Sequence, residues 1–313
     1  PVEGVVPQFF KTLVGSESYP EQQDFELEEE TGQDNHRILV LGDMHLANRT
    51  NNDVEQFQDF IADISQVVAG TDVPVYGLTL GDMTWDTFWY ANHFAFHEYL
   101  EQIEKVPGLP IYHTIGNHDH EFGYAGNYPA GDYATSMEYR KYLGPTYYSF
   151  NIGQIHYVVL DDIECMNDGT GEDTEYNVRL TSEQVTWLKQ DLAHVDKSST
   201  LVLSTHSQIH NKTGGQVLKN YDDLMIAIDD FKDVHIFTGH THLVYNWEVD
   251  GFYDNILEHN AGAICATWWW SGKHSGIHVC QDGAPGGYTI VDVNGSGLKW
   301  QYKGIGKDTD FQF

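Results

Sequence analysis

His36-Arg37-Ile38-Leu39-Val40-Leu41-Gly42-Asp43-Met44-His45 is the stretch of sequence that indicates the fold of this chain. Its first six residues end in a short apolar run, which is typical of a strand buried in a sheet. Gly42 follows this run and allows the backbone to turn sharply. We therefore predict a buried strand at residues 36–41 that presents Asp43 and His45 at its carboxyl end.

The same arrangement recurs along the chain. Further apolar strands are predicted at residues 73–80, 109–115, 201–205 and 234–238. The polar residues that follow them are Gly81-Asp82, Gly116-Asn117-His118-Asp119, His206 and Gly239-His240-Thr241-His242. The spacing of apolar residues predicts helices at 54–68, 87–105, 181–193 and 221–231. Strands that alternate with helices indicate βαβ units, a largely parallel sheet and an α/β fold.

The remaining segments complete the predicted order of elements. Antiparallel strands are predicted at 146–151 and 155–160, with a turn at Gly153 between them and a long loop at 161–180 after them. Beyond Leu243 the pattern is mostly β, with turns expected at Asp250-Gly251 and Asn294-Gly295. Residues 1–35 lack strong periodicity, and we interpret them as a lead-in segment.

Composition limits the classes of function. The 313 residues include 16 Lys and Arg and 47 Asp and Glu, so the formal net charge is −31. This charge repels polyanions, and nucleic acid is therefore not an expected partner. No apolar run reaches the roughly 18–20 residues that span a bilayer, so no transmembrane segment is predicted. The spacing of Cys165, Cys265 and Cys280 matches no zinc or disulfide framework, and both a Cys265–Cys280 bridge and three free thiols stay open.

The polar residues after the five strands predict a metal site. Ligands of open α/β sheets bind outside the carboxyl ends of the strands, so these side chains should converge. Carboxylate, imidazole and amide oxygen together suit Mn, Fe or Zn better than an all-oxygen calcium site. A carboxylate in the middle of the set can bridge two ions, and ions about 3.5–4 Å apart stabilise both oxygens of a displacement at phosphorus.

The five blocks resemble the calcineurin-like metallophosphoesterase superfamily. Its pattern is GDxH, GDxx, GNH followed by D or E, a lone H, and GHxH, and all five blocks occur here in order over roughly residues 36–245. The resemblance implies a four-layered α/β/β/α sandwich. It also implies a catalytic domain at residues 36–313, in which 261–313 add closing strands.

The resemblance also implies a role for each matching residue. Asp43, His45 and His242 would hold the first metal ion, and Asn117, His206 and His240 would hold the second. Asp82 would bridge the two ions together with a water or hydroxide. His118 would assist the departing oxygen without binding metal, and Asp119 could orient His118 or a neighbouring ligand.

One position departs from two subgroups of the superfamily. Purple acid phosphatases have a tyrosine ligand three residues after the bridging aspartate, where this chain has Trp85. Ser/Thr protein phosphatases have at that position an aspartate that supports the catalytic histidine, and here Asp86 is displaced from it by one residue. The sequence therefore favours neither subgroup.

A narrower resemblance concerns the two ends of the chain. Residues 6–10, 24–27, 268–276, 282–288 and 291–304 look like exported, multidomain metallophosphoesterases of Bacteroides-type bacteria. In that group a catalytic core lies between two flanking modules, which implies a periplasmic or cell-envelope location and makes residues 1–35 the tail of an N-terminal module. The chain begins at Pro1 without an apolar signal segment, and we expect any export signal to lie outside it.

The predicted function is hydrolysis of a phosphoric ester, either a monoester or a diester, by a metal-bridging hydroxide with the assistance of His118. Expected substrates are a phosphorylated small molecule, a glycan or a lipid head group, because the few Lys and Arg residues suit few phosphates. Candidate substrate contacts are His120, Trp268, Trp269 and Lys273, and burial in a strand is an equal alternative for the tryptophans. The other functions considered are a non-catalytic metal-binding protein and a nuclease, which the charge disfavours.

Overall fold

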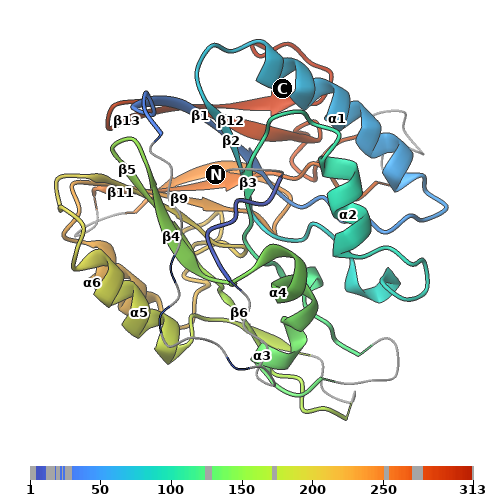
Figure 1. Cartoon of the computed structure of the whole chain (residues 1–313), viewed down its shortest axis with the longest axis horizontal. Helices are drawn as coiled ribbons and strands as arrows, with labels where there is room; N and C mark the ends of the chain where they lie inside the picture. Colours follow the sequence, from blue (N-terminus) through green and yellow to red (C-terminus); the bar gives the residue numbers. More distant parts are fainter. Residues whose placement is uncertain are drawn as a thin grey trace.

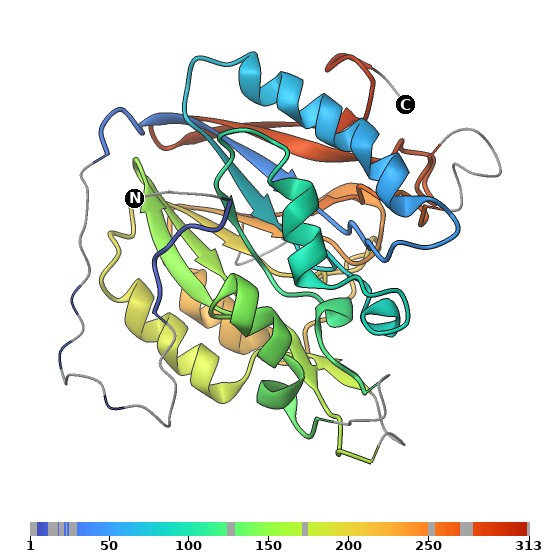
Figure 2. The ribbon, with the colours of Figure 1, turned by 45° about the vertical axis from the view of Figure 1, so that its right-hand side comes forward.

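The structure is a computed structural model, which describes residues 5–11, 18, 22, 24, 30–123, 129–170, 175–249, 254–269 and 278–311. Two large sheets pack face to face, with helices on the outer side of each (Figure 1; Figure 2). The predicted four-layered α/β/β/α sandwich is therefore confirmed.

The first sheet contains the strand from which the fold was predicted. Its strand order is β13-β12-β1-β2-β3. The strands are β1 (Asn35–Leu41), β2 (Val75–Thr79), β3 (Ile111–Tyr112), β12 (Gly287–Asn294) and β13 (Gly297–Gly304). β1 runs parallel to β2 and antiparallel to β12. The two last strands of the chain thus extend the first sheet.

The second sheet has the strand order β10-β11-β9-β8-β5-β4. Its strands are β4 (Tyr148–Ile152), β5 (Ile155–Val159), β8 (Thr200–Ser204), β9 (Asp233–Thr238), β10 (Val244–Glu248) and β11 (Ile256–Ala261). β5, β8 and β9 run parallel to one another. Their carboxyl ends therefore meet at one edge of the sheet, as do those of β1, β2 and β3 in the first sheet.

Three apolar cores hold the layers together. Helices α1 (Asp53–Ala69) and α2 (Phe96–Ile103) pack on the outer side of the first sheet, where Phe57 and Phe60 are fully buried. Helices α5 (Ser182–Leu192) and α6 (Tyr221–Ile228) pack on the outer side of the second sheet. The third core lies between the sheets and joins residues of β1 and β2 to residues of β5, β8 and β9.

The structure corrects several predicted elements. The helix expected at 87–105 is a short 3-10 turn, η1 (Asp86–Phe88), followed by α2, because the backbone of His93 adopts a positive φ of 51° that interrupts helical geometry. The loop expected at 161–180 contains the antiparallel pair β6 (Ile163–Cys165) and β7 (Tyr176–Val178). Helices α3 (Asp132–Thr135) and α4 (Met137–Leu143) were not predicted. The expected turn at Asp250-Gly251 lies outside the described residues.

All three cysteines are buried and free, so Cys265 and Cys280 are not bridged in this structure. Among the described residues, no helix combines the length and the apolar character that a membrane crossing requires.

Candidate metal centre

The carboxyl ends of the strands bring all seven predicted ligand residues together. Asp43 and His45 follow β1, Asp82 follows β2, and Asn117 begins the 3-10 turn η2 (Asn117–Asp119) after β3. His206 follows β8, and His240 and His242 follow β9. The sites expected from both sheets therefore form one cluster.

The first group of donors consists of Asp43, His45 and His242. The two Nε2 atoms of His45 and His242 are 3.1 Å apart. Oδ1 of Asp43 is 3.4 Å from Nε2 of His242 and 3.8 Å from Nε2 of His45. Three donor atoms at these separations can point at one ion.

The second group consists of Asn117, His206 and His240. Nε2 of His206 is 2.9 Å from Oδ1 of Asn117 and 3.1 Å from Nδ1 of His240. Oδ2 of Asp82 lies 3.4 Å from Nε2 of His206 and 3.5 Å from Nε2 of His45. The Asp82 carboxylate therefore lies between the two groups, where a bridging ligand belongs.

The backbone at the cluster is strained. Asp43, His45, Asp82, His240 and His242 all have positive φ values between 41° and 63°. Non-glycine residues adopt this region rarely, and clusters of such residues occur where a fold holds side chains for a function. The strain is consistent with side chains directed toward a shared ligand.

Two glycines make this close approach possible. A Cβ atom at Gly116 would lie 2.3 Å from Oδ1 of Asp82, and a Cβ atom at Gly239 would lie 2.5 Å from Oδ2 of Asp43. A side chain at either position would displace a carboxylate of the cluster. The glycine in the GN and GH blocks is therefore required by packing.

The electrostatics of the cluster fit bound cations. Burial by itself would raise the pKa values of Asp43 and Asp82, but the imidazoles of His242 and His206 hold these pKa values below their usual range. Burial would lower the pKa of His206, and the Asp82 carboxylate instead raises it to about 10. Burial lowers the pKa of His45 to about 4. Buried carboxylates thus depend on adjacent positive charge, which metal ions supply well.

Hydrogen bonds behind the ligands fix the imidazole rings. Nδ1 of His206 donates to the carbonyl oxygen of Leu80 at 2.7 Å, and Nδ1 of His242 donates to that of Ala266 at 2.6 Å. In both rings Nε2 therefore faces the cluster with its lone pair available for a metal. This fit of the donor atoms supports the predicted ligand set.

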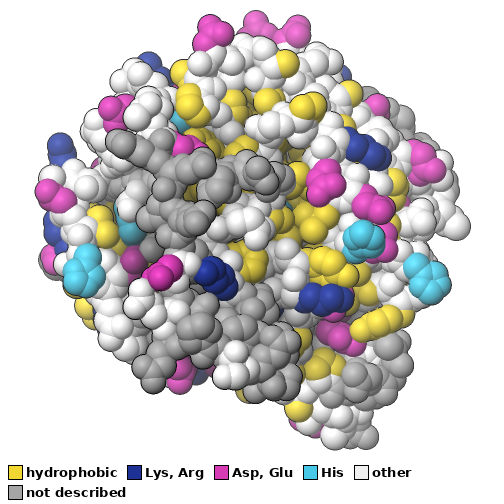
Figure 3. Space-filling view, in the orientation of Figure 1, with side chains coloured by type: hydrophobic (Ala, Val, Ile, Leu, Met, Phe, Trp, Pro, Cys, Tyr) yellow, Lys and Arg dark blue, Asp and Glu magenta, His cyan; other side chains and the backbone are white. Residues whose placement is uncertain are grey.

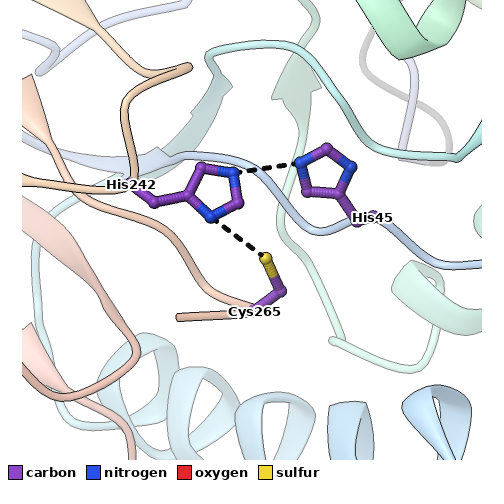
Figure 4. Close-up of side chains that lie close together, drawn as sticks. All are labelled: His45, His242 and Cys265. Carbon is purple, nitrogen blue, oxygen red and sulfur yellow. Dashed lines mark hydrogen bonds between the residues drawn. The ribbon is translucent and has the colours of Figure 1, made fainter. Parts of the chain in front are cut away.

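Cys265 lies behind the first group. Its Sγ atom is 3.7 Å from Nδ1 of His242, whereas the other ring nitrogen of His242, Nε2, faces His45, as Figure 4 shows. His45, His242 and Cys265 together have the spacing of a metal site. However, the Nδ1 atom of His242, which faces Sγ, already donates a hydrogen bond to the carbonyl oxygen of Ala266. We therefore describe Cys265 as a neighbour of a ligand; the spacing of cysteines in the sequence gave no sign of this contact.

His118 lies beside the cluster and is paired with Asp86. The Nδ1 atom of His118 is 2.8 Å from Oδ1 of Asp86, and its backbone N–H donates to Oδ1 of Asp82 at 2.8 Å. Burial would lower the pKa of His118, but Asp82 and Asp86 raise it above its usual value. The imidazole side chain of His118 is 26% exposed.

Asp119, which was expected to orient His118 or a neighbouring ligand, has backbone partners in the loops of two ligand residues. The Asp119 carboxylate accepts hydrogen bonds from the backbone N–H groups of Gly116 at 3.0 Å and Thr84 at 3.2 Å. It thereby joins the loop of Asp82 to the loop of Asn117. The carboxylate paired with His118 is that of Asp86, and the sequence offered only the proximity of Asp86 to the aspartate position of the protein phosphatases.

The predicted substrate contacts divide into three cases. The ring of Trp268 lies 4.1 Å from the ring of His45, beside the cluster. Trp269 is 1% exposed, and its ring N–H donates to the carbonyl oxygen of Met44 at 2.8 Å. His120 is fully buried. The expected substrate contacts of Trp269 and His120 are therefore wrong, because the chain itself covers both side chains. Lys273 lies outside the described residues.

Comparisons with known proteins find a protein family that matches most of the chain. The calcineurin-like phosphoesterase family matches residues 36–244, and a second family, the C terminal of calcineurin-like phosphoesterase, matches residues 258–313. Purple acid phosphatase 23 of Arabidopsis thaliana is 23% identical over 253 residues, which are 69% of this chain and 50% of that protein. Purple acid phosphatase 15 of Arabidopsis thaliana is 27% identical over 244 residues, which are 68% of this chain and 42% of that protein.

The fold is similar to that of a purple acid phosphatase from yellow lupin (Lupinus luteus) seeds. The TM-score is 0.55 at 16% identity, and the match covers 91% of this chain and 52% of that one. The chain thus spans about half the length of these relatives. Because the family match covers more than half of its residues, this chain belongs to the calcineurin-like phosphoesterase family.

Proposed function

We propose that this protein hydrolyses phosphoric esters with two metal ions. The observation that carries the proposal is the position of the Asp82 carboxylate, 3.5 Å from His45 and 3.4 Å from His206, between two groups of buried donors. Two ions would be bound by both donor groups, whereas a single ion would leave one group without a bound metal.

Each metal ion would have its own set of ligand residues. Asp43, His45 and His242 would hold the first ion, Asn117, His206 and His240 the second, and Asp82 would bind both. When bound, two ions of Mn, Fe or Zn supply Lewis-acid chemistry, which activates a water molecule as the nucleophile and neutralises phosphate oxygens. The strained backbone of the ligands holds their donor atoms in place before any ion binds.

His118 would donate the proton that the leaving oxygen needs. Its pairing with Asp86 places hydrogen on Nδ1 and orients the ring, so that Nε2–H can face the substrate. As the phosphorus–oxygen bond breaks, its electron pair moves to the leaving oxygen and the proton passes from Nε2 to that atom. General acid assistance of this kind typically contributes about 10²- to 10⁴-fold.

The substrates that the site suits are esters with few phosphates, either monoesters or diesters. A phosphorylated small molecule, a glycan or a lipid head group fits this description. The net charge of −31 opposes polyanions. On the described part of the face in Figure 3, Lys and Arg side chains are scattered among acidic ones and form no continuous basic surface. The resemblance to exported family members supports a periplasmic or cell-envelope location.

Hydrolysis of p-nitrophenyl phosphate and bis-p-nitrophenyl phosphate tests the proposal. We expect turnover of at least one ester with added Mn²⁺, loss of turnover with a chelator, and recovery when the metal is returned. Turnover of only one ester would assign the ester class. Metal-loaded protein that hydrolyses neither ester faster than buffer would contradict the proposal and favour a non-catalytic metal-binding protein.

A further inference from the structure

Two tryptophans from distant parts of the chain stack beside the first group of donors. Trp85 follows β2, and Trp268 follows β11. The centroids of their rings are 4.5 Å apart, and the interplanar angle is 30°. The Trp268 ring is also 4.1 Å from the ring of His45 and 5.0 Å from that of His242. These two side chains, the indole pair, give the polar centre one apolar wall, and both remain partly exposed.

The backbone holds Trp268 in this position. Its φ is +60°, and that of Ala266 is +56°. A bulky residue in this region is an outlier, which persists only where the surroundings determine it. The neighbouring Trp269 supplies such surroundings, because its buried ring donates to the carbonyl of Met44 between two ligand residues. The surrounding contacts thus hold the Trp268 indole beside the metal centre in spite of its strained backbone.

The other half of the indole pair is fixed by its own contacts. The guanidinium of Arg49 lies 4.4 Å from the Trp85 ring, and the Phe88 ring meets Trp85 edge-on at 5.2 Å. Arg49 is in turn 3.4 Å from the buried carboxylate of Asp53 at the start of α1. A cation on an aromatic face and an edge-on ring both restrict the indole. The indole pair is therefore preorganised, so binding an apolar group there would lose little conformational entropy of these side chains.

The indole pair also lies beside the proposed acid. The ring of His118 is 5.5 Å from that of Trp85 and 6.0 Å from that of Trp268. The oxygen that takes a proton from His118 becomes the hydroxyl oxygen of the leaving alcohol, so the carbon part of that alcohol would lie on the side of the centre where the indole pair stands. Aromatic rings meet favourably in offset or edge-on contacts at 4.5–7 Å between centroids.

We propose that Trp85 and Trp268 form a leaving-group subsite that selects phosphoric esters of aromatic alcohols over esters of small polar alcohols. The proposal rests on the function proposed above, because it uses the position of His118 relative to the metal centre. It adds the class of alcohol, which neither the metal ligands nor the family determines.

Binding of phosphonates measures the subsite without turnover. Metal-loaded wild type should bind phenylphosphonate more tightly than methylphosphonate in titration calorimetry. Trp85→Leu and Trp268→Leu should each reduce this preference about 2- to 12-fold, the range expected for one aromatic contact. The ratio of kcat/KM for phenyl phosphate to that for glycerol phosphate should fall by a similar factor.

Controls separate loss of the subsite from damage to the centre. Trp300→Leu removes a tryptophan that is 37% exposed on β13 and packs on His259, and it should leave both ratios unchanged. Trp85→Phe and Trp268→Phe keep a ring and should keep most of the preference if the leucine variants fail to fold or lose metal. Wild type that hydrolyses esters without preferring phenyl ligands would overturn the subsite alone, and so would leucine variants with full metal content and unchanged ratios. Wild type that hydrolyses no ester would overturn the proposed function as well.

Discussion

The carboxylate of Asp86 lies 2.8 Å from Nδ1 of His118, and Asp86 itself is 2% exposed. Asp86 thus orients the imidazole of His118, which belongs to neither of the two donor groups described above. Asp86→Asn keeps the shape and removes the charge. We expect kcat to fall about 10- to 100-fold with metal content unchanged, as is typical when the partner that orients a functional imidazole is replaced.

The matched control for this variant is Asp292→Asn, because Asp292 also pairs with a basic residue, Arg37, but is half exposed and lies on β12. It should leave kcat unchanged. An Asp86→Asn protein with wild-type kcat would show that the pair has no role in positioning His118.

His118 and Asp82 are predicted to fail in different ways. His118→Ala should lower kcat about 10²- to 10⁴-fold and retain the metals, because His118 is not a ligand. Asp82→Asn should lose metal and nearly all activity, because its carboxylate lies between the two groups. Metal analysis beside steady-state kinetics distinguishes them, and loss of metal from His118→Ala would disprove its assigned role.

Gly116→Ala should destabilise the protein. The added Cβ would lie 2.3 Å from Oδ1 and 2.4 Å from the backbone nitrogen of Asp82, and a backbone atom cannot move aside cheaply. Such overpacking costs about 1–3 kcal/mol, measurable by urea denaturation. Gly297→Ala is the control, because its Cβ would meet only a carbonyl oxygen at 3.6 Å. Equal free energies of unfolding for the two variants would contradict the tight packing of Gly116 on Asp82.

His113 should contribute to loss of stability in acid. It is buried, its Nε2 is 3.0 Å from the hydroxyl of Tyr99, and burial lowers its pKa to about 3. In the unfolded chain the imidazole takes up a proton below about pH 6.5, whereas the folded protein keeps it neutral. The unfolded state therefore binds more protons between about pH 6.5 and 3, and stability falls as the pH falls through this range.

His113→Gln removes this contribution. The dependence of unfolding free energy on pH should become shallower by up to about 1.4 kcal/mol per pH unit below pH 6.5. His97→Gln, at a position whose side chain is 63% exposed, should keep the wild-type dependence. Parallel curves for wild type and His113→Gln would contradict a neutral His113 in the folded protein.

The convergence of these side chains could be predicted from the sequence because its signals are local. Each strand is an apolar run that ends in a glycine or a polar residue, and parallel strands bring their ends together. Asp43, Asp82 and His206 could therefore be assigned to one site from these local patterns alone. The turn between β12 and β13 followed from the signal at Asn294-Gly295, and the closing strands themselves were implied by the family resemblance.

The parts that escaped prediction depend on contacts between distant segments. Asp86 pairs with His118 because η1 replaces the start of a predicted helix, and helical periodicity does not reveal that break. The burial of His120 depends on α3, which has only four residues. The stacking of Trp85 on Trp268 joins loops of the two sheets, and no local pattern encodes such a pair.

The metal content of the purified, metal-reconstituted protein tests the central claim most directly. Inductively coupled plasma mass spectrometry, calibrated against protein concentration, should find close to two ions of Mn, Fe or Zn per chain. The same measurement on Asp82→Asn should find fewer, since Asp82 lies between both donor groups. One ion or fewer per wild-type chain after reconstitution would contradict a dinuclear centre.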